Sequence, residues 1–301
     1  MPSMNFRVVK AVVRFNFALM LDGFGPVKYQ RFLFSTVAPL LAKKVTGVRS
    51  EPADVPGIPA EWLIPDGAAD DRVLLYLHGG GYVIGDINSH RGLVSQIAAA
   101  SGCRALIIDY RLAPEHKVPA AVEDAVASYR WLLSQGYAPE KIVVAGDSAG
   151  GGLTVATMVS LRDSGEPLPA AALLLSPWVD LEVVGESCKT VGWRDPMVSE
   201  RILKKYTRLY MGEKDPKDPL ASPMYADLKG LPPLLIHVGT CEVLMDDAKR
   251  LAAKAEKDGV DVELDVCDGM FHVWQFFSPV VPESKDAIDR LGKFARDHLP
   301  A

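Results

Sequence analysis

A serine between two glycines follows an apolar run in the middle of this 301-residue chain. The stretch IVVAGDSAGGGL, residues 142–153, places Ser148 between Gly146 and Gly150, after a strand-like segment and before a helix-like one. A sharp turn from strand to helix forces its central residue into an uncommon backbone conformation, and small neighbours let the chain close around it. The pattern predicts a nucleophile elbow that presents the Ser148 hydroxyl at the edge of a sheet. A helix capped by Ser148 or Asp147 is the alternative interpretation.

Three glycines follow another apolar segment, in LYLHGGGYVIG at residues 75–85. Glycine leaves backbone N–H groups uncovered, so that they can approach a ligand closely. The spacing does not fit a P-loop, nor a dinucleotide-binding fingerprint, which would need glycine in place of Ile84. We therefore expect the N–H groups of Gly80, Gly81 and Ala149 to form an oxyanion hole for an acyl carbonyl that becomes tetrahedral.

A serine nucleophile needs a base and an acid on neighbouring loops. Among the six histidines, His272 is the one that both follows Ser148 and lies just beyond the carboxyl end of a predicted strand. The acid is expected after the preceding strand, PLLIHVG, where TCEVLMDD offers Glu242, Asp246 and Asp247. Glu242 comes first after the turn, whereas the aspartates begin a helix, where negative charge suits the helix dipole. Glu242 is the predicted acid, with Asp246 as the alternative.

Strands and helices alternate over most of the chain. Apolar runs typical of strands buried on both faces occur at 72–78, 104–110, 141–147, 171–177 and 233–239, and a more alternating run at 261–267 suits a sheet edge. Amphipathic segments typical of helices lie near 90–101, 119–135, 149–163, 245–258 and 283–298. This order predicts an α/β fold with a mainly parallel sheet covered by helices.

Two segments interrupt the alternation. Residues 1–45 have a helical pattern rich in aromatic and aliphatic side chains, and residues 178–230 hold no clear strand. Segments of this kind commonly cover the carboxyl ends of the strands. We expect both to form a helical cap, with residues 46–301 as the catalytic domain. Several side chains of the first segment either line an acyl pocket of limited length or belong to the core: Phe6, Phe15, Phe17, Met20 and Phe24.

Composition narrows the class of protein. Hydrophobic residues make up 49% of the chain, which is typical of a packed globular protein, and a net charge of −5 argues against nucleic acid or an anionic membrane as the main partner.

A basic and apolar N-terminal stretch imitates a signal peptide, but Asp22 interrupts it and no cleavage site follows. No run reaches the ~18 apolar residues of a membrane span. The four cysteines lie far apart and have no metal-binding spacing: Cys103, Cys188, Cys241 and Cys267. We expect a cytoplasmic protein with reduced thiols.

These motifs together resemble those of the hormone-sensitive lipase-like esterases, bacterial family IV, of the α/β-hydrolase fold. HGGG at 78–81 and GDSAG at 146–150 are the pair by which that family is recognised. Three further blocks are similar: DYRLAPEHKVPAAVEDA at 109–125, SPWVDL at 176–181 and GMFHVW at 269–274. The resemblance covers most of the chain after the first segment. It implies an eight-stranded, mostly parallel sheet with a cap, and hydrolysis of short- to medium-chain acyl esters without cofactor or metal.

The resemblance also implies roles for single residues. It places the nucleophile at Ser148, the base at His272 and the acid at Glu242, although EVL stands where most members have DPL. Its oxyanion donors correspond to the three N–H groups named above. In the DYRLAPE block, Arg111 and Glu115 either bind substrate or, as we expect, form a structural ion pair beside the glycines. Asp147 is expected to organise the loop rather than to take part in the chemistry.

Other functions would use the same residues. Some relatives open lactones or remove acetyl groups, and an amidase differs only in the leaving group of its substrate. The alternative from another class is a non-catalytic protein that binds a small molecule on the same scaffold. Plant gibberellin receptors resemble the family but have lost the catalytic histidine, whereas this chain keeps His272. An uncovered last strand at 261–267 also predicts a homodimer, because a free sheet edge invites pairing.

Overall fold

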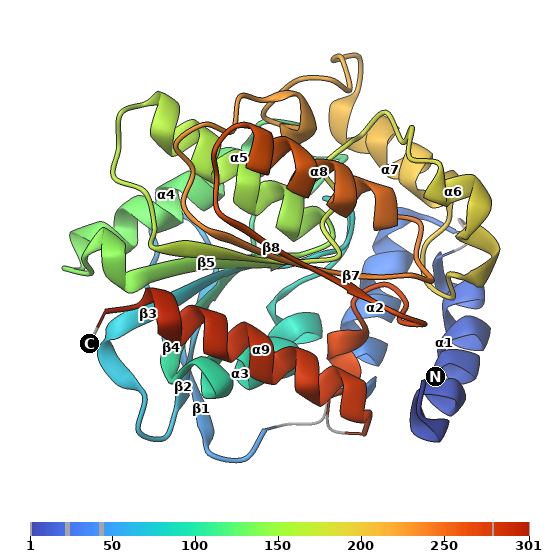
Figure 1. Ribbon diagram of the computed structural model, residues 1–301, viewed down its shortest axis with the longest axis horizontal. Coiled ribbons are helices and arrows are strands. Elements are labelled where there is room, and N and C mark those ends of the chain that lie inside the picture. The colour runs from blue at the N-terminus through green and yellow to red at the C-terminus, as the bar shows by residue number, and fades with distance from the viewer. Residues whose placement is uncertain (1, 22–24, 42–44, 279, 301) are drawn as a thin grey trace.

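The sheet that the sequence predicts is present in the computed structural model, which describes residues 2–21, 25–41, 45–278 and 280–300, with side-chain surroundings for all of these except 15–21 and 41. Within these ranges the sheet has eight strands in the order β1-β2-β4-β3-β5-β6-β7-β8 (Figure 1). β2 pairs antiparallel with both β1 and β4, and the other neighbours are parallel. The strands are β1 (Val48–Ala53), β2 (Ala60–Pro65), β3 (Ala69–Leu77), β4 (Cys103–Ile108), β5 (Ile142–Asp147), β6 (Ala171–Leu175), β7 (Leu234–Gly239) and β8 (Val262–Cys267).

Helices cover both faces of the sheet (Figure 1). α4 (Ala120–Ser134), α5 (Ala149–Asp163) and α8 (Met245–Lys257) lie on one face, and α3 (Ile87–Ser101) and α9 (Pro282–His298) on the other. Every residue of β5, β6 and β7 is buried, which explains why these strands are apolar without alternation. The α/β fold and its mainly parallel sheet are therefore confirmed.

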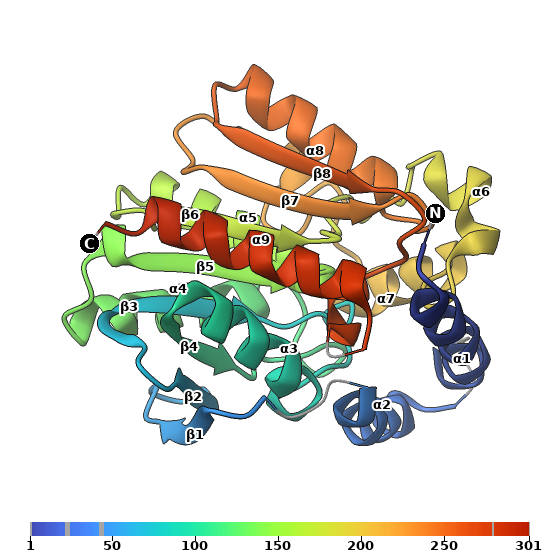
Figure 2. The same ribbon diagram turned by 60° about the horizontal axis from the view of Figure 1, so that its bottom comes forward.

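Four further helices gather at one end of the sheet (Figure 2): α1 (Met4–Leu21), α2 (Val27–Leu41), α6 (Ser187–Thr190) and α7 (Glu200–Met211). The N-cap of α7 is Ser199, whose hydroxyl accepts a hydrogen bond from the N–H of Ile202 at 3.3 Å. Short 3-10 helices occur at Pro139–Lys141, Gly192–Arg194, Pro223–Tyr225 and Trp274–Phe277. Within the described ranges, every helix is too short or too polar to cross a lipid bilayer.

β1 and β2 are the strands that hydrophobic pattern did not predict. β1 reads VRSEPA and is mostly exposed, and the residues of β2 become buried only in its second half. They pair antiparallel beside β4, where one face of the sheet can remain in water, so no continuous apolar run is needed. The six predicted strands are all present, with β8 at the opposite edge as expected.

Candidate active site

Ser148 stands at the turn between β5 and α5. Its backbone has φ 53° and ψ −120°, a conformation that residues other than glycine rarely adopt. The Ser148 N–H donates a hydrogen bond to the carbonyl of Leu175 at 2.8 Å, which fixes the turn to β6. A Cβ at Gly146 would lie 2.3 Å from the Gly150 carbonyl oxygen, and a Cβ at Gly150 would lie 1.9 Å from that of Leu77. Both glycines are therefore needed for the chain to pass through this turn.

The Asp147 carboxylate joins the glycine loop to the serine turn. Its Oδ1 accepts hydrogen bonds from the Tyr76 hydroxyl at 2.9 Å and from the Gly79 N–H at 3.0 Å, and its Oδ2 lies 3.4 Å from His90 Nε2. Burial alone would raise the pKa of Asp147, but the charge and hydrogen bonding of His90, together with the Tyr76 hydroxyl, bring it below its usual value. Asp147 thus holds two loops together as an anion.

Gly80 and Gly81 border the same cavity as Ser148. Their φ angles are +117° and +63°, and a Cβ at Gly80 would lie 2.1 Å from the carbonyl oxygen of Ile84. Among the hydrogen bonds of the described residues, none uses the N–H groups of Gly80, Gly81 or Ala149, the first residue of α5. Three backbone donors near one serine are the feature that an oxyanion hole needs.

His272 follows β8, and its ring faces Glu242 on the loop after β7. The distance between His272 Nδ1 and Glu242 Oε2 is 2.8 Å, and both side chains are buried. The other carboxylate oxygen, Oε1, accepts hydrogen bonds from the Ser176 hydroxyl at 2.9 Å and from the Gly239 N–H at 2.5 Å. The structure therefore brings the predicted base and the predicted acid into direct contact.

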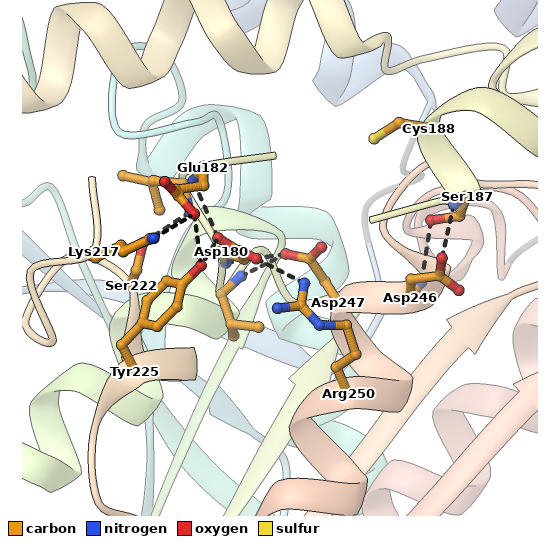
Figure 3. Close-up of polar contacts among 12 residues, drawn as sticks. Asp180, Glu182, Ser187, Cys188, Lys217, Ser222, Tyr225, Asp246, Asp247 and Arg250 are labelled. Atoms are coloured by element: carbon orange, nitrogen blue, oxygen red, sulfur yellow. Dashed lines mark hydrogen bonds and ion pairs between the residues drawn. The ribbon is translucent and has the colours of Figure 1, made fainter. Parts of the chain in front are cut away.

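Asp246, the alternative acid, binds a different part of the chain. Its Oδ2 accepts a hydrogen bond from the Ser187 N–H at 2.8 Å (Figure 3). Asp247 also binds a different part of the chain, because its Oδ2 accepts hydrogen bonds from the N–H groups of Val179 and Asp180, each at 3.1 Å. Of the three carboxylates considered from the sequence, Glu242 is the one that contacts His272 in the described part of the chain.

Ser148 and His272 line one cavity, although no hydrogen bond joins their side chains among the described residues. Without substrate, contacts of this kind are often long and tighten only when a ligand binds. The remaining walls come from α2, the loop after β6, the segment before α7, α7 itself and the loop after β8, and include Phe34, Trp178, Met197, Val198, Ile202, Leu203, Tyr206 and Phe276. The cavity is thus assembled from segments far apart in the sequence.

Of the five side chains proposed for the acyl pocket, Phe6 is the one whose surroundings the structure describes. Phe6 is buried against Phe271, with ring centroids 5.1 Å apart, and belongs to the core rather than to the lining of this cavity. The side chains of Phe15, Phe17 and Met20, and all of Phe24, lie outside the described residues. From the N-terminal segment, Phe34 takes the lining position instead.

The expected ion pair between Arg111 and Glu115 is wrong. Arg111 pairs with Asp124 at 2.8 Å, because the first turns of α4 bring that carboxylate next to the loop. Glu115 pairs with Arg31 of α2 at 2.7 Å, and Arg31 also donates a hydrogen bond to the carbonyl of Val83 at 2.8 Å. Arg31 thus connects the N-terminal helices to the glycine loop, and no local sequence pattern predicts this contact.

Ser176 is a site residue that sequence reasoning missed. Its hydroxyl donates to Glu242 Oε1 at 2.9 Å and accepts a hydrogen bond from the N–H of Val273, the residue after His272, at 3.1 Å. Ser176 has φ 47°, an unusual value for a serine. It connects the acid with the backbone beside the base. The only available signal was its place at the start of the SPWVDL block.

On a sheet of this topology, a serine turn and a histidine that share a cavity beyond the strand ends are the arrangement of the α/β hydrolases. A family model described as alpha/beta hydrolase fold matches residues 74–276. An acetyl-hydrolase of Streptomyces hygroscopicus is 49% identical to this chain over 237 residues, 79% of each chain. A putative acetyl-hydrolase of Mycobacterium tuberculosis, LipR, is 36% identical over 298 residues, 98% of this chain and 96% of that one.

A crystal structure of an esterase from the bacterial hormone-sensitive lipase family is similar over the whole length. It covers 100% of both chains with a TM-score of 0.96 and 49% sequence identity. The chain therefore belongs to the hormone-sensitive lipase-like esterases of the α/β-hydrolase fold.

Proposed function

We propose that this carboxylic ester hydrolase acts on short- to medium-chain acyl esters, with Ser148 as nucleophile, His272 as base and Glu242 as acid. The observation that carries the proposal is the single cavity bordered by Ser148, His272, Gly80 and Gly81. In this proposal residues 1–45 and 178–230 act as the cap over the catalytic domain of residues 46–301, because Phe34 and α7 contribute to the cavity. The reaction as proposed uses no cofactor and no metal.

The first half of the reaction transfers the acyl group to the enzyme. His272 Nε2 takes the proton of the Ser148 hydroxyl while Oγ forms a bond to the ester carbonyl carbon. The carbonyl oxygen becomes an anion and accepts hydrogen bonds from the N–H groups of Gly80, Gly81 and Ala149. The bond from carbon to the alcohol oxygen then breaks, and the alcohol leaves with the proton from His272.

The second half hydrolyses the acyl-enzyme. His272 takes a proton from water, and the hydroxide oxygen bonds to the acyl carbon. When the bond from that carbon to Ser148 Oγ breaks, the carboxylic acid leaves and Oγ recovers its proton from His272. Throughout, the hydrogen bond to Glu242 keeps the proton on Nδ1, so that Nε2 remains free to act as base, and the carboxylate stabilises the imidazolium.

Substrate panels and covalent labelling test this proposal together. Purified protein is expected to hydrolyse p-nitrophenyl butyrate and to react once per chain with a fluorophosphonate probe. A protein that only binds small molecules would do neither. Matched ester, lactone and anilide substrates, with acetyl compounds among them, then separate an esterase from a lactone hydrolase, a deacetylase or an amidase, because these differ only in the group that leaves.

The pH dependence of kcat/KM is expected to report His272. Burial by itself lowers the pKa of His272, but the hydrogen bond and charge of Glu242, with the charges of Asp195 and Asp147, raise it above the usual value of about 6.5. The imidazole must be neutral to accept a proton, so activity is lost as the pH falls through this raised pKa. Initial rates on p-nitrophenyl butyrate from acid to alkaline pH measure it. The acid limb of the profile is the part in which activity falls as the pH is lowered. An acid limb centred below the usual histidine pKa would contradict the expectation.

Tyr206 is expected to limit the length of the acyl chain. Its ring lies next to Gly81, where an added Cβ would be 2.2 Å from the ring, and its hydroxyl donates to Gln30 Oε1 at 3.1 Å. Tyr206→Ala would open this wall and is expected to raise the kcat/KM ratio of octanoate to butyrate esters by about tenfold. Tyr206→Phe keeps the ring and should keep the wild-type ratio. Equal ratios in all three proteins would exclude Tyr206 as the limit.

β8 suggests a homodimer, because it is hydrogen-bonded only to β7 among the described strands and its other edge has no strand partner there. Light scattering is expected to give twice the mass of one chain; the mass of a single chain at every concentration would contradict it.

The proposal also includes a cytoplasmic location. Reduced thiols at all four cysteines, Cys103, Cys188, Cys241 and Cys267, belong to the same proposal.

A further inference from the structure

The loop between β7 and α8, residues 240–244, carries Glu242 and is bound by the 178–230 segment. Val243, the residue after Glu242, has both of its peptide groups held by that segment. Its N–H donates to Asp195 Oδ2 at 3.0 Å, and its carbonyl accepts a hydrogen bond from the Ser187 hydroxyl. Ser187 is itself anchored to Asp246 at the start of α8 (Figure 3). The position of Glu242 therefore depends on side chains outside its own loop.

Asp195 also holds part of the cavity wall. While its Oδ2 binds the loop of Glu242, its Oδ1 accepts hydrogen bonds from the N–H groups of Met197 at 2.9 Å and Val198 at 3.0 Å. Both of these residues line the cavity of Ser148 and His272. Hydrogen bonds from N–H groups to a carboxylate are among the stronger ones in proteins. A single side chain thus connects the substrate wall with the neighbour of the acid.

We propose that Asp195 is a positioning residue for Glu242, and that it fixes the acid loop and the Met197–Val198 wall as one unit. This inference rests on the proposed function, because it assumes that Glu242 orients the catalytic base. Displacing a catalytic group by about 1 Å can lower a rate by about a hundredfold. If Asp195 no longer bound the Val243 N–H, the contact between Glu242 and His272 would lose one of its supports.

The charges of two titratable groups of the site, His272 and Glu242, act on Asp195. Burial raises the pKa of Asp195 to about 6, the charge of His272 opposes this increase, and Glu242 adds to it. At pH 8 Asp195 is therefore ionised, and its charge helps to keep the pKa of His272 raised. Removing the charge should shift the acid limb of activity to lower pH. A residue that only stabilised the fold would not move this limb.

Asp247 offers a matched control in the same region. It is a buried carboxylate that accepts two backbone hydrogen bonds from the 178–230 segment, from Val179 and Asp180, and Asp180 in turn pairs with Arg250 at 2.7 Å (Figure 3). Among its hydrogen bonds in the described residues, none reaches Val243, and Asp247 does not line the cavity. Asp247→Asn thus perturbs the same segment without touching the acid loop.

The test compares wild type, Asp195→Asn and Asp247→Asn in the full-length chain. For p-nitrophenyl butyrate and octanoate we would measure kcat, KM and the pH profile, with thermal unfolding to compare stability. Asp195→Asn is expected to lower kcat by roughly tenfold to a hundredfold, with its acid limb at lower pH and a changed ratio between the two esters. Asp247→Asn should stay within about twofold of wild-type kcat, with an unchanged limb, even if it unfolds at a lower temperature.

An unchanged kcat and acid limb in Asp195→Asn would overturn the proposal, as would equal losses in both variants. If Asp195→Asn does not fold, Ser187→Ala gives the decision, because it removes the hydroxyl that binds the other peptide group of Val243 and leaves that carbonyl with the longer contact from Cys188 Sγ at 3.8 Å. That variant is expected to lose kcat by about threefold, as for one lost hydrogen bond, and wild-type kcat would overturn the proposal. A wild-type protein that neither hydrolyses esters nor reacts with the phosphonate would instead refute the proposed function itself.

Discussion

Ser148→Ala is expected to lower kcat for p-nitrophenyl butyrate by about a million-fold, the size of effect seen when a serine nucleophile is removed. Alanine keeps the Cβ and fits the turn, whose φ of 53° is set by the surrounding backbone, so the fold should remain. The backbone donors of Gly80 and Gly81 stay in place and account for any residual rate. The measurement is single-substrate kinetics, with phosphonate labelling of the same sample.

Replacement of another buried serine serves as the control for a general loss of folding. Ser128 is also buried, and its hydroxyl donates to the carbonyl of Asp124 inside α4, away from the lining of the cavity. Ser128→Ala should retain wild-type kcat and labelling. If Ser148→Ala were as active as Ser128→Ala, Ser148 would have no part in the mechanism.

Glu242→Gln is expected to lower kcat by about ten-thousandfold, because an amide in place of the carboxylate lets the imidazole adopt the wrong tautomer. The substitution keeps the size of the side chain, so its partners Ser176 and Gly239 remain close. It also removes the hydrogen bond and charge that raise the pKa of His272, so the acid limb of the residual activity should move to lower pH. Full pH profiles of kcat/KM for both proteins measure the two effects.

Two further variants separate the candidate acids. Glu242→Asp shortens the side chain, which then cannot reach His272 while keeping its bonds to Ser176 and Gly239, so an intermediate rate is expected. Asp246→Asn changes a carboxylate that binds Ser187 instead, and most of the activity should remain. A larger loss in Asp246→Asn than in Glu242→Gln would mean that the acid has been assigned to the wrong residue.

The parts of the site that sequence could predict are those in which local backbone demands are strong. A buried strand, a turn that tolerates only glycine at 146 and 150, and a following helix leave few interpretations for Ser148. His272 followed from its place after a strand and after the serine. Glu242 could only be favoured over Asp246, because both are short-range neighbours of the same turn. Their directions depend on partners from other parts of the chain, which are Ser176 and His272 for Glu242 and Ser187 for Asp246.

The parts that sequence could not predict depend on long-range contacts. Glu115 has an arginine four residues before it, yet its partner is Arg31 in a helix near the start of the chain. Ser176 looks like any serine before a proline until β6, β7 and the loop after β8 come together around it. β1 is an edge strand and β2 lies directly inside it, and neither carries much apolar pattern because residues there stay partly exposed. For Glu115 and Ser176 the deciding interaction joins segments that no local spacing relates.

The walls of the cavity include Phe34 of α2 and, more than two hundred residues later in the sequence, His272 and Phe276. Domains synthesised on the ribosome begin to fold from the N-terminus. The nascent chain therefore exposes the elbow serine more than a hundred residues before the histidine that would activate it has been made. The growing polypeptide is therefore expected to be inert toward esters until the segment that carries His272 and Phe276 has been translated.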